Sequence, residues 1–490
     1  MTCGTLAVSF RFSTLLHTWW FSTTLYNYIL LPRITEFVNV INPATGEQLD
    51  SYDEHTWSDV DSALERATEA FEEWRKQSIR ERERLLETAG RVLRNNKDEY
   101  AEIITLEMGK PITQARAEVE KCAWVCDHYA EYGSTYLEDR HHPSPPGTTV
   151  KTVHQPLGPV LAVMPWNFPF WQVFRFAAPY LTAGNVGVLK HASNVPGCAI
   201  AIEEIFSEAG YPEGVFQSLL VSSDLVADII ADDRIRAATL TGSGPAGRAV
   251  AAAAGEKIKK TVLELGGSDP FVVLDDADIE SAAETGTQAR NQNGGQSCIA
   301  AKRFVVHTEI YDKFIEALID SFESLVVGDP TDENTDVGPQ ARVDLLTELH
   351  EQVETSIEAG ATLVTGGEPL DREGAFYPPT ILTDIPDGCP VDSEETFGPV
   401  AAVYEVADER EAVTLANNTE FGLGASVWTA DRERGEHIAK QIEAGCVYIN
   451  QLVKSDPRVP FGGVGESGYG RELSEIGIKE FVNRKTVWIE

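Results

Sequence analysis

Short apolar runs that recur between residues 159 and 274 constrain the fold of this chain more than any other feature. The runs are PVLAVMPW, VGVLK, VFQSLLV, AATLT, TVLEL and PFVVL, and helix-like stretches separate several of them, as at residues 195–209 and 245–258. Strands that alternate with helices form parallel sheets whose two faces the helices cover. The sequence therefore predicts an α/β protein built on a parallel sheet.

The flanking segments extend this pattern. Residues 58–136 contain apolar positions at helical spacing, a second α/β section covers about residues 279–450, and the C-terminal FVNRKTVWI is strand-like. A chain of 490 residues is expected to form two or three domains, at roughly 100–200 residues each.

The chain has 77 acidic and 40 basic residues and a formal net charge of −37. Such a surface repels phosphate backbones and anionic lipids, so we expect neither a nucleic-acid partner nor a membrane partner. The acidic residues are scattered, which argues against a disordered acidic tail. We interpret the surface as adapted to high salt, which screens self-repulsion; an ordinary acidic enzyme is the alternative.

The seven cysteines are too scattered for a disulfide framework, and their number is odd. Cys122 and Cys126 share a predicted helix face without a second ligand pair, so we predict packing and no metal site. This cysteine usage favours a cytoplasmic protein. Residues 1–35 contain no acidic residue, no clean apolar span and no convincing secretory signal. We interpret them as an extension outside the fold, with a membrane or targeting role as the alternative.

A glycine-rich loop indicates phosphate binding. LTGSGPAG places Gly242, Gly244 and Gly247 between a predicted strand and a helix, as in the G-x-G-x-x-G pattern that brings phosphate to a helix N-terminus. In that pattern an acid that binds ribose is expected on the next strand. The acid found there is Glu264 in LELGG, which does not fit that role. Lys190 ends the predicted strand NVGVLK, where it can bind ribose hydroxyls or a 2′-phosphate, or simply be solvated.

Three further residues form a reactive constellation. Cys298 follows two glycines in NQNGGQSC, unlike a thiol packed among apolar neighbours. Glu264 ends a β-rich run, where partial burial suits a general base. Asn167, in the rigid turn MPWNFPFW, can donate its amide to a developing oxyanion. Each residue also has a purely structural interpretation, but together they predict a covalent acyl-transfer site.

The chain resembles the aldehyde dehydrogenase superfamily over residues 36–490. The resemblance lies in PWNFP, LELGGSDP, GGQSC, EETFGPV, NNTEFGLGASVWT and PFGGVGESGYGRE, which occur in the family's order. It implies a homodimer or homotetramer with the family's α/β fold. The implied parts are a Rossmann-type nucleotide-binding domain (residues 36–137 and 155–266), an α/β catalytic domain (267–466) and a small strand-built oligomerisation element (138–154 and 467–490).

The resemblance also implies a mechanism of NAD(P)-dependent aldehyde oxidation. Cys298 would be the nucleophile, and Asn167 with the Cys298 backbone N–H would stabilise the oxyanion of the thiohemiacetal. Hydride transfer would leave a thioester, which water activated by Glu264 would release as a carboxylic acid.

The same comparison assigns the cofactor residues. They are Gly242, Ser243 and Gly247 at the pyrophosphate, Trp166 and Lys190 at the adenosine, Glu395 at the nicotinamide ribose and Phe397 at the nicotinamide ring. NAD-preferring members commonly carry a glutamate three residues after the strand-end lysine, where this chain has Ser193. Serine does not repel a 2′-phosphate, so we expect NADP to be favoured over NAD.

The substrate residues resemble those of the succinate-semialdehyde dehydrogenase-like branch. Arg175 lies where that branch holds a distal carboxylate, a group that guanidinium fits bidentately, and Ser455 lies near its substrate serine. The second arginine of many such enzymes is Gln292 here. On the matches at Arg175 and Ser455, we expect succinate semialdehyde as the substrate. The alternatives are 2-oxoglutarate semialdehyde or another short aldehyde, a CoA-acylating enzyme, and a catalytically silent binding protein of the same fold.

Overall fold

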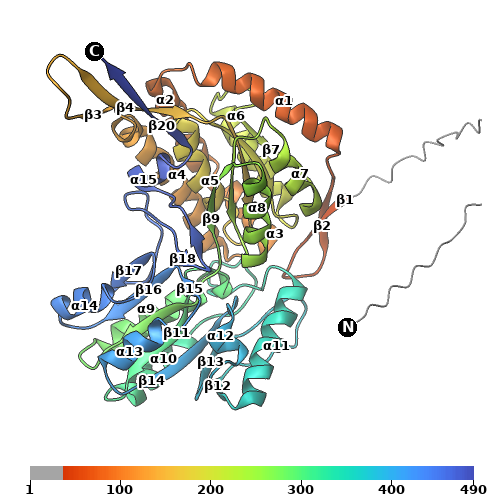
Figure 1. Ribbon diagram of the computed structural model, residues 1–490. Helices are drawn as coiled ribbons and strands as arrows, with labels where there is room; N and C mark the ends of the chain where they lie inside the picture. The colour runs from red at the N-terminus through yellow and green to blue at the C-terminus, as the bar shows by residue number, and fades with distance from the viewer. Residues whose placement is uncertain (1–36) are drawn as a thin grey trace, which may run out of the picture. The chain divides into compact units, whose positions relative to one another are not determined.

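Two mainly parallel sheets organise residues 37–490, the part of the chain that the computed structural model describes (Figure 1). The predicted N-terminal extension lies outside these residues. The first sheet contains, in spatial order, β19 (Gly468–Tyr469), β9 (Lys260–Glu264), β8 (Ala237–Thr241), β5 (Pro159–Met164), β6 (Val186–His191) and β7 (Phe216–Ser218). Its strands run parallel except β19, which pairs antiparallel with β9. The predicted α/β class is confirmed.

The second sheet has its own strands. They are, in spatial order, β12 (Thr362–Thr365), β13 (Thr380–Thr383), β14 (Val400–Val406), β11 (Ala301–His307), β10 (Asp269–Val273), β16 (Gly424–Trp428) and β17 (Cys446–Ile449). Only β12 runs antiparallel to its neighbour. The run PFVVL, grouped above with the strands of one sheet, forms β10 and therefore belongs to the second sheet.

Helices cover the first sheet and form one large core with it. They are α1 (Trp57–Trp74), α2 (Ile79–Asn95), α3 (Lys97–Met108), α4 (Ile112–Tyr136), α5 (Trp171–Thr182), α6 (Pro196–Glu208), α7 (Val226–Ala231) and α8 (Gly244–Glu256), with a 3-10 turn η1 (Ser223–Leu225). The N-cap of α1 is Thr56, whose side chain forms a capping box with Asp59. Its apolar residues at helical spacing, such as Val60, Leu64 and Phe71, are buried.

Three smaller cores pack against the second sheet. In β10, Phe271 and Val273 pack into one cluster while Val272 packs into another, because successive side chains of a strand point to opposite faces. The elements around this sheet are α9 (Ile279–Asn291), η2 (Gln292–Gly295), α10 (Tyr311–Glu323), α11 (Val343–Ala359), α12 (Pro390–Ser393), α13 (Glu409–Ala416) and α14 (Arg432–Ala439).

A third sheet projects from the body as an arm (Figure 1). It consists of β20 (Val482–Ile489), β4 (Thr149–Pro156) and β3 (Arg140–His142), all antiparallel. The short elements that remain are β1 (Phe37–Ile41), β2 (Gln48–Asp53), β15 (Phe421–Gly422), β18 (Val464–Gly465) and α15 (Ser474–Ile478).

Neither a membrane span nor a metal cluster occurs in the described part of the chain. Within residues 37–490 no helix has the length and apolar character to cross a bilayer. The same residues contain no group of three or more His, Cys, Asp or Glu side chains placed to hold a metal ion.

Candidate active site

A cavity of about 610 Å³ lies at the carboxyl ends of β8 and β9, the edge at which open α/β sheets bind ligands. Loops and the helix α11 (Val343–Ala359), all from the second half of the chain, complete its wall. Many of the predicted site residues line it, namely Trp166, Asn167, Gly242, Ser243, Glu264, Cys298, Glu395 and Phe397. Segments that are far apart in the sequence thus bring the predicted thiol, carboxylate and amide into one cavity.

The loop before Cys298 explains the glycines in NQNGGQSC. Asn293, Gly294 and Gly295 all have left-handed backbone angles, with φ of 57°, 62° and 73°. This region is costly for most side chains but accessible to glycine and asparagine. A side chain at Gly295 would also overlap the carbonyl of Gly398. The two glycines therefore permit the tight turn that presents the thiol.

Lys302 fixes the cysteine loop through hydrogen bonds to its backbone. Its ammonium donates hydrogen bonds to the carbonyl oxygens of Ser297 (3.0 Å) and Cys298 (2.8 Å). The Cys298 backbone N–H has no acceptor among the described residues, which suits a donor for an oxyanion. Burial raises the pKa of the Cys298 thiol to about 12, although the charges of Arg175 and Lys302 act in the opposite direction. The thiol consequently needs a base to become a nucleophile.

The Asn167 amide is oriented by a network of hydrogen bonds. Gln172 donates to Asn167 Oδ1 (3.1 Å). Asn167 Nδ2 must therefore face the other way, where it donates to the carbonyl of Gln296 (3.0 Å). The backbone carbonyl of Asn167 accepts from Lys110 (2.9 Å) and from Asn293 (2.7 Å). The orientation of an amide follows from such partners, and here they direct the donor side toward the cysteine loop.

Glu264 is a buried carboxyl group at the end of β9. Both of its oxygens lack hydrogen-bond partners among the described residues. Burial, and then the charge of Glu472, raise its pKa well above the usual range. A carboxyl group perturbed in this way suits proton transfer near neutral pH.

The other end of the cavity has features that fit a dinucleotide. Ser243 is the N-cap of α8, and its side chain makes no capping hydrogen bond, so the N–H groups of that first turn can receive phosphate oxygens. Glu395 accepts from the Gly267 N–H at 3.0 Å and lies 3.6 Å from the Lys302 ammonium. Phe397 meets Trp166 edge to face, with ring centroids 5.8 Å apart.

Three predicted cofactor residues lie outside this lining. Gly247 faces Leu265, and a Cβ there would approach the Leu265 side chain to 2.6 Å, so this glycine lets α8 pack closely. Lys190 and Ser193 line a neighbouring cavity of about 880 Å³. Glu54 also lines that cavity and accepts from a backbone N–H at 2.6 Å.

The predicted substrate residues are not in the cavity lining either. Arg175 is buried and forms an ion pair with the buried carboxylate of Glu472, and it donates to Thr241 Oγ1 at 3.2 Å. Arg175 is therefore not a surface residue of its helix, because only 3% of this side chain is exposed. Gln292 is exposed at the end of α9. Ser455 is buried and accepts hydrogen bonds from two side chains of the first half of the chain.

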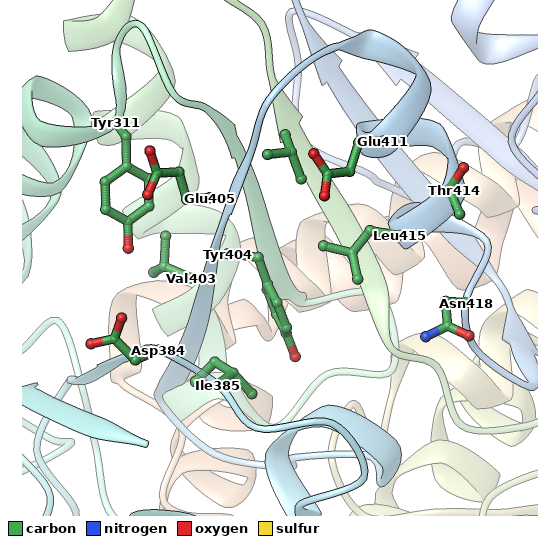
Figure 2. A pocket seen from close by; sticks show the side chains of 11 residues that line it. Tyr311, Asp384, Ile385, Val403, Tyr404, Glu405, Glu411, Thr414, Leu415 and Asn418 are labelled. Atoms are coloured by element: carbon green, nitrogen blue, oxygen red, sulfur yellow. The ribbon is translucent and has the colours of Figure 1, made fainter. Parts of the chain in front are cut away.

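A third cavity differs in chemistry (Figure 2). It has a volume of about 470 Å³ and lies beside β14, with Glu405, Glu411 and Asp384 among its lining residues. None of its lining residues is a thiol or a basic side chain, and none is a predicted site residue. We therefore take the cavity at Cys298 as the candidate active site.

Several residues of this site were missed by sequence reasoning. They are Lys110, Gln172, Gln296, Lys302 and Glu472. One signal was available for Lys302, because a lysine inside the apolar run IAAKRFVV must bury its charge against a partner. The other residues act through contacts between distant segments, which a single sequence does not reveal.

The geometry defines a class of protein. It is an α/β protein with two sheets, and its cavity brings together a thiol, a carboxyl group and an amide donor next to a helix N-terminus that suits a dinucleotide. Residues 32–487 match the model of the aldehyde dehydrogenase family. The chain therefore belongs to the aldehyde dehydrogenase family, as the resemblance of its motifs predicted.

Individual relatives agree with this assignment. The chain is 52% identical over 452 residues to a Synechocystis protein named probable succinate-semialdehyde dehydrogenase (NADP+), covering 92% of this chain and 99% of that protein. It is 50% identical over 459 residues to succinate-semialdehyde dehydrogenase (NADP+) 1 of Mycobacterium tuberculosis, with the same coverage. The solved structure of succinic semialdehyde dehydrogenase from Streptococcus pyogenes, in complex with NADP+, matches with a TM-score of 0.90 and 39% identity, over 92% of this chain and 99% of that one.

Proposed function

We propose that this protein oxidises succinate semialdehyde to succinate, with NADP favoured over NAD. The observation that carries the proposal is the cavity that joins Cys298, Glu264 and Asn167. The substrate and cofactor are supported by relatives about half identical to this chain that are named succinate-semialdehyde dehydrogenases (NADP+).

The first step forms a bond between the Cys298 sulfur and the aldehyde carbon. Because burial raises the pKa of the thiol, the thiol proton must pass to a base as the bond forms. Glu264 lines the same cavity, and its raised pKa makes its carboxylate a better acceptor for this proton than an ordinary glutamate. The aldehyde oxygen becomes an oxyanion, which accepts hydrogen bonds from the Asn167 amide and the Cys298 N–H.

The second half of the reaction needs an acceptor for hydride and a base for water. NADP, when bound, supplies the hydride acceptor. Ser243, Glu395 and Phe397 would hold it in the cavity, with Lys190 and Ser193 at its adenosine end. Glu264, after it has released the thiol proton to solvent, takes a proton from the water that attacks the thioester. The Cys298 sulfur leaves and recovers this proton, and the carboxylic acid is released and ionises.

Initial rates test this proposal directly. The wild-type protein should oxidise succinate semialdehyde with a higher kcat/KM than 2-oxoglutarate semialdehyde or butanal, and with NADP above NAD, without added CoA. A preference for 2-oxoglutarate semialdehyde would replace the substrate assignment. Dependence on CoA would indicate an acylating enzyme, and a folded protein inactive on all these aldehydes would indicate a binding protein.

The Ser193→Glu variant should shift the cofactor preference toward NAD. A carboxylate at this position can accept hydrogen bonds from ribose hydroxyls and repel a 2′-phosphate. The ratio of kcat/KM for NADP to that for NAD should fall about tenfold or more. Ser193→Ala is the matched control and should keep the wild-type ratio. An unchanged ratio in Ser193→Glu would place the phosphate away from this residue.

The assembly and the surface complete the proposal. We propose the domain boundaries given above, a homodimer or homotetramer joined through β20, and a cytoplasmic, salt-adapted protein. Trp488 and Ile489 at the end of β20 are 57% and 51% exposed, and one edge of this strand has no partner strand among the described residues. Unpaired strand edges favour pairing with a second chain. The net charge of −37 supports the adaptation to salt.

A further inference from the structure

A lysine that the sequence analysis did not consider lies beside the predicted substrate residue Ser455. Lys121 belongs to α4, and its ammonium donates to Ser455 Oγ at 2.9 Å. The same ammonium lies 4.2 Å from the centre of the Trp171 ring. Trp171 Nε1 also donates to Ser455 Oγ, at 2.9 Å. Three residues from separate segments thus form one polar cluster at the start of α5.

The hydrogen bonds of Ser455 leave its proton available. A hydroxyl group has two acceptor lone pairs and one donor proton. Lys121 and Trp171 occupy the acceptor positions, and no described residue accepts a hydrogen bond from Ser455. The Ser455 hydroxyl therefore directs an unused donor away from these two partners, toward an acceptor that the protein does not supply.

Lys121 is a half-buried cation without an ionic partner. No carboxylate of the described residues lies within salt-bridge distance of it, although acidic residues outnumber basic ones by 77 to 40. Arg175, in contrast, is already paired with Glu472. A partly buried charge is costly without a partner, so an unpaired lysine in so acidic a protein indicates that a ligand provides the counter-charge.

The charge of Arg175 connects this cluster to the reacting thiol. The Arg175 charge lowers the pKa of Lys121 and also that of Cys298. Both groups therefore lie within electrostatic range of one guanidinium. The family resemblance expects a second cation at position 292, where this chain has an exposed glutamine. We propose that Lys121 is this second cation and that, together with the Ser455 hydroxyl, it binds the distal carboxylate of the aldehyde.

This inference rests on the proposed function, and it is tested by comparing two aldehydes. Butanal has the chain length of succinate semialdehyde with a methyl group in place of the carboxylate. In Lys121→Met, kcat/KM for succinate semialdehyde should fall about tenfold to a hundredfold, the range for losing a charged hydrogen bond, while kcat/KM for butanal should stay within about threefold. Lys121→Arg should recover most of the loss, because it restores the charge.

A matched control comes from the same helix. Arg116 of α4 pairs with Asp98 and Glu333 at the surface, so Arg116→Met removes a cation from α4 without touching the cluster. It should leave the ratio between the two aldehydes unchanged. Melting temperature and NADP binding are measured for each variant.

The wild-type protein provides a test that needs no substitution. Burial, and then the charge of Arg175, lower the pKa of Lys121 to about 8, against the opposing charges of Cys122, Glu118 and Asp456. The ammonium is charged below this pH and neutral above it. The ratio of kcat/KM for succinate semialdehyde to that for butanal should therefore be constant below pH of about 8 and fall above it.

The outcomes separate this inference from the proposed function. A wild-type enzyme that does not prefer succinate semialdehyde to butanal overturns both. The role of Lys121 alone is overturned if the preference for succinate semialdehyde persists in Lys121→Met and the wild-type preference stays constant between about pH 7 and about pH 9.5, a range that spans the pKa of Lys121. An equal loss for both aldehydes would make Lys121 a structural residue and overturn it as well.

Discussion

Replacing Cys298 with alanine is expected to lower the rate of aldehyde oxidation by roughly 10⁴-fold or more, as found when a covalent nucleophile is removed. Binding of NADP should be retained, because the side chains assigned to the cofactor come from other segments. The measurement is the initial rate of NADPH formation, with NADPH binding followed by fluorescence on the same sample.

Cys446→Ala is the matched control for this variant. Cys446 is a free, half-buried cysteine whose thiol pKa is also raised by burial, and its sulfur donates weakly to the carbonyl of Leu423. Its replacement should leave the rate nearly unchanged. Activity above about a hundredth of the wild type in Cys298→Ala would contradict covalent catalysis at this residue.

The second large effect is expected on stability, at the buried pair of Arg175 and Glu472. Replacing Arg175 with methionine should lower the free energy of unfolding by roughly 3–5 kcal/mol, because it leaves a buried carboxylate without its partner. The two side chains are 3% and 0% exposed, so water cannot solvate the carboxylate that loses its partner. The double variant Arg175→Met with Glu472→Leu should recover much of the loss, because both charges are then absent.

An exposed ion pair serves as the comparison. Arg432 and Glu436 are 88% and 51% exposed, and Arg432→Met should cost no more than about 0.5 kcal/mol. All variants are measured by denaturant unfolding at one salt concentration. Equal losses at the two sites, or a double variant as unstable as the two single ones combined, would show that the buried pair is not coupled.

The same pair limits what an Arg175 variant can say about the substrate. A loss of activity in Arg175→Ala could follow from the unpaired Glu472 or from the altered pKa of Glu264, which Glu472 raises and Arg175 lowers. Lys121 has no carboxylate partner in the described residues. Its replacement therefore gives the cleaner measure of carboxylate binding.

The sequence predicted the parts of the site that depend on local chemistry. Gly294 and Gly295 could be interpreted because a left-handed turn needs such residues. The strands that carry Glu264 and Lys190 could be placed because parallel strands appear as continuous apolar runs. The carboxyl ends of such strands meet at one edge, so the sequence also indicated where a ligand binds.

The parts that depend on contacts between distant segments could not be predicted. Gln172 orients Asn167 only because the first turn of α5 folds back on the preceding loop. Lys121 and Ser455 are separated by more than three hundred residues and meet through packing alone. Arg175 was expected to face a ligand, but Glu472, which no local pattern connects to it, occupies its guanidinium.

Trapping the acyl-enzyme is the most direct test of the central claim, that Cys298 carries the substrate and Glu264 releases it. Glu264→Gln can accept a proton neither from the thiol nor from water, so the thiol proton must pass to solvent. Mixing with succinate semialdehyde and NADP should then form about one NADPH per site, more slowly than in the wild type, followed by much slower turnover. Mass spectrometry of the quenched protein should then find a succinyl thioester on the peptide that contains Cys298. NADPH formation without an adduct on Cys298, or steady turnover at the wild-type rate, would contradict this account.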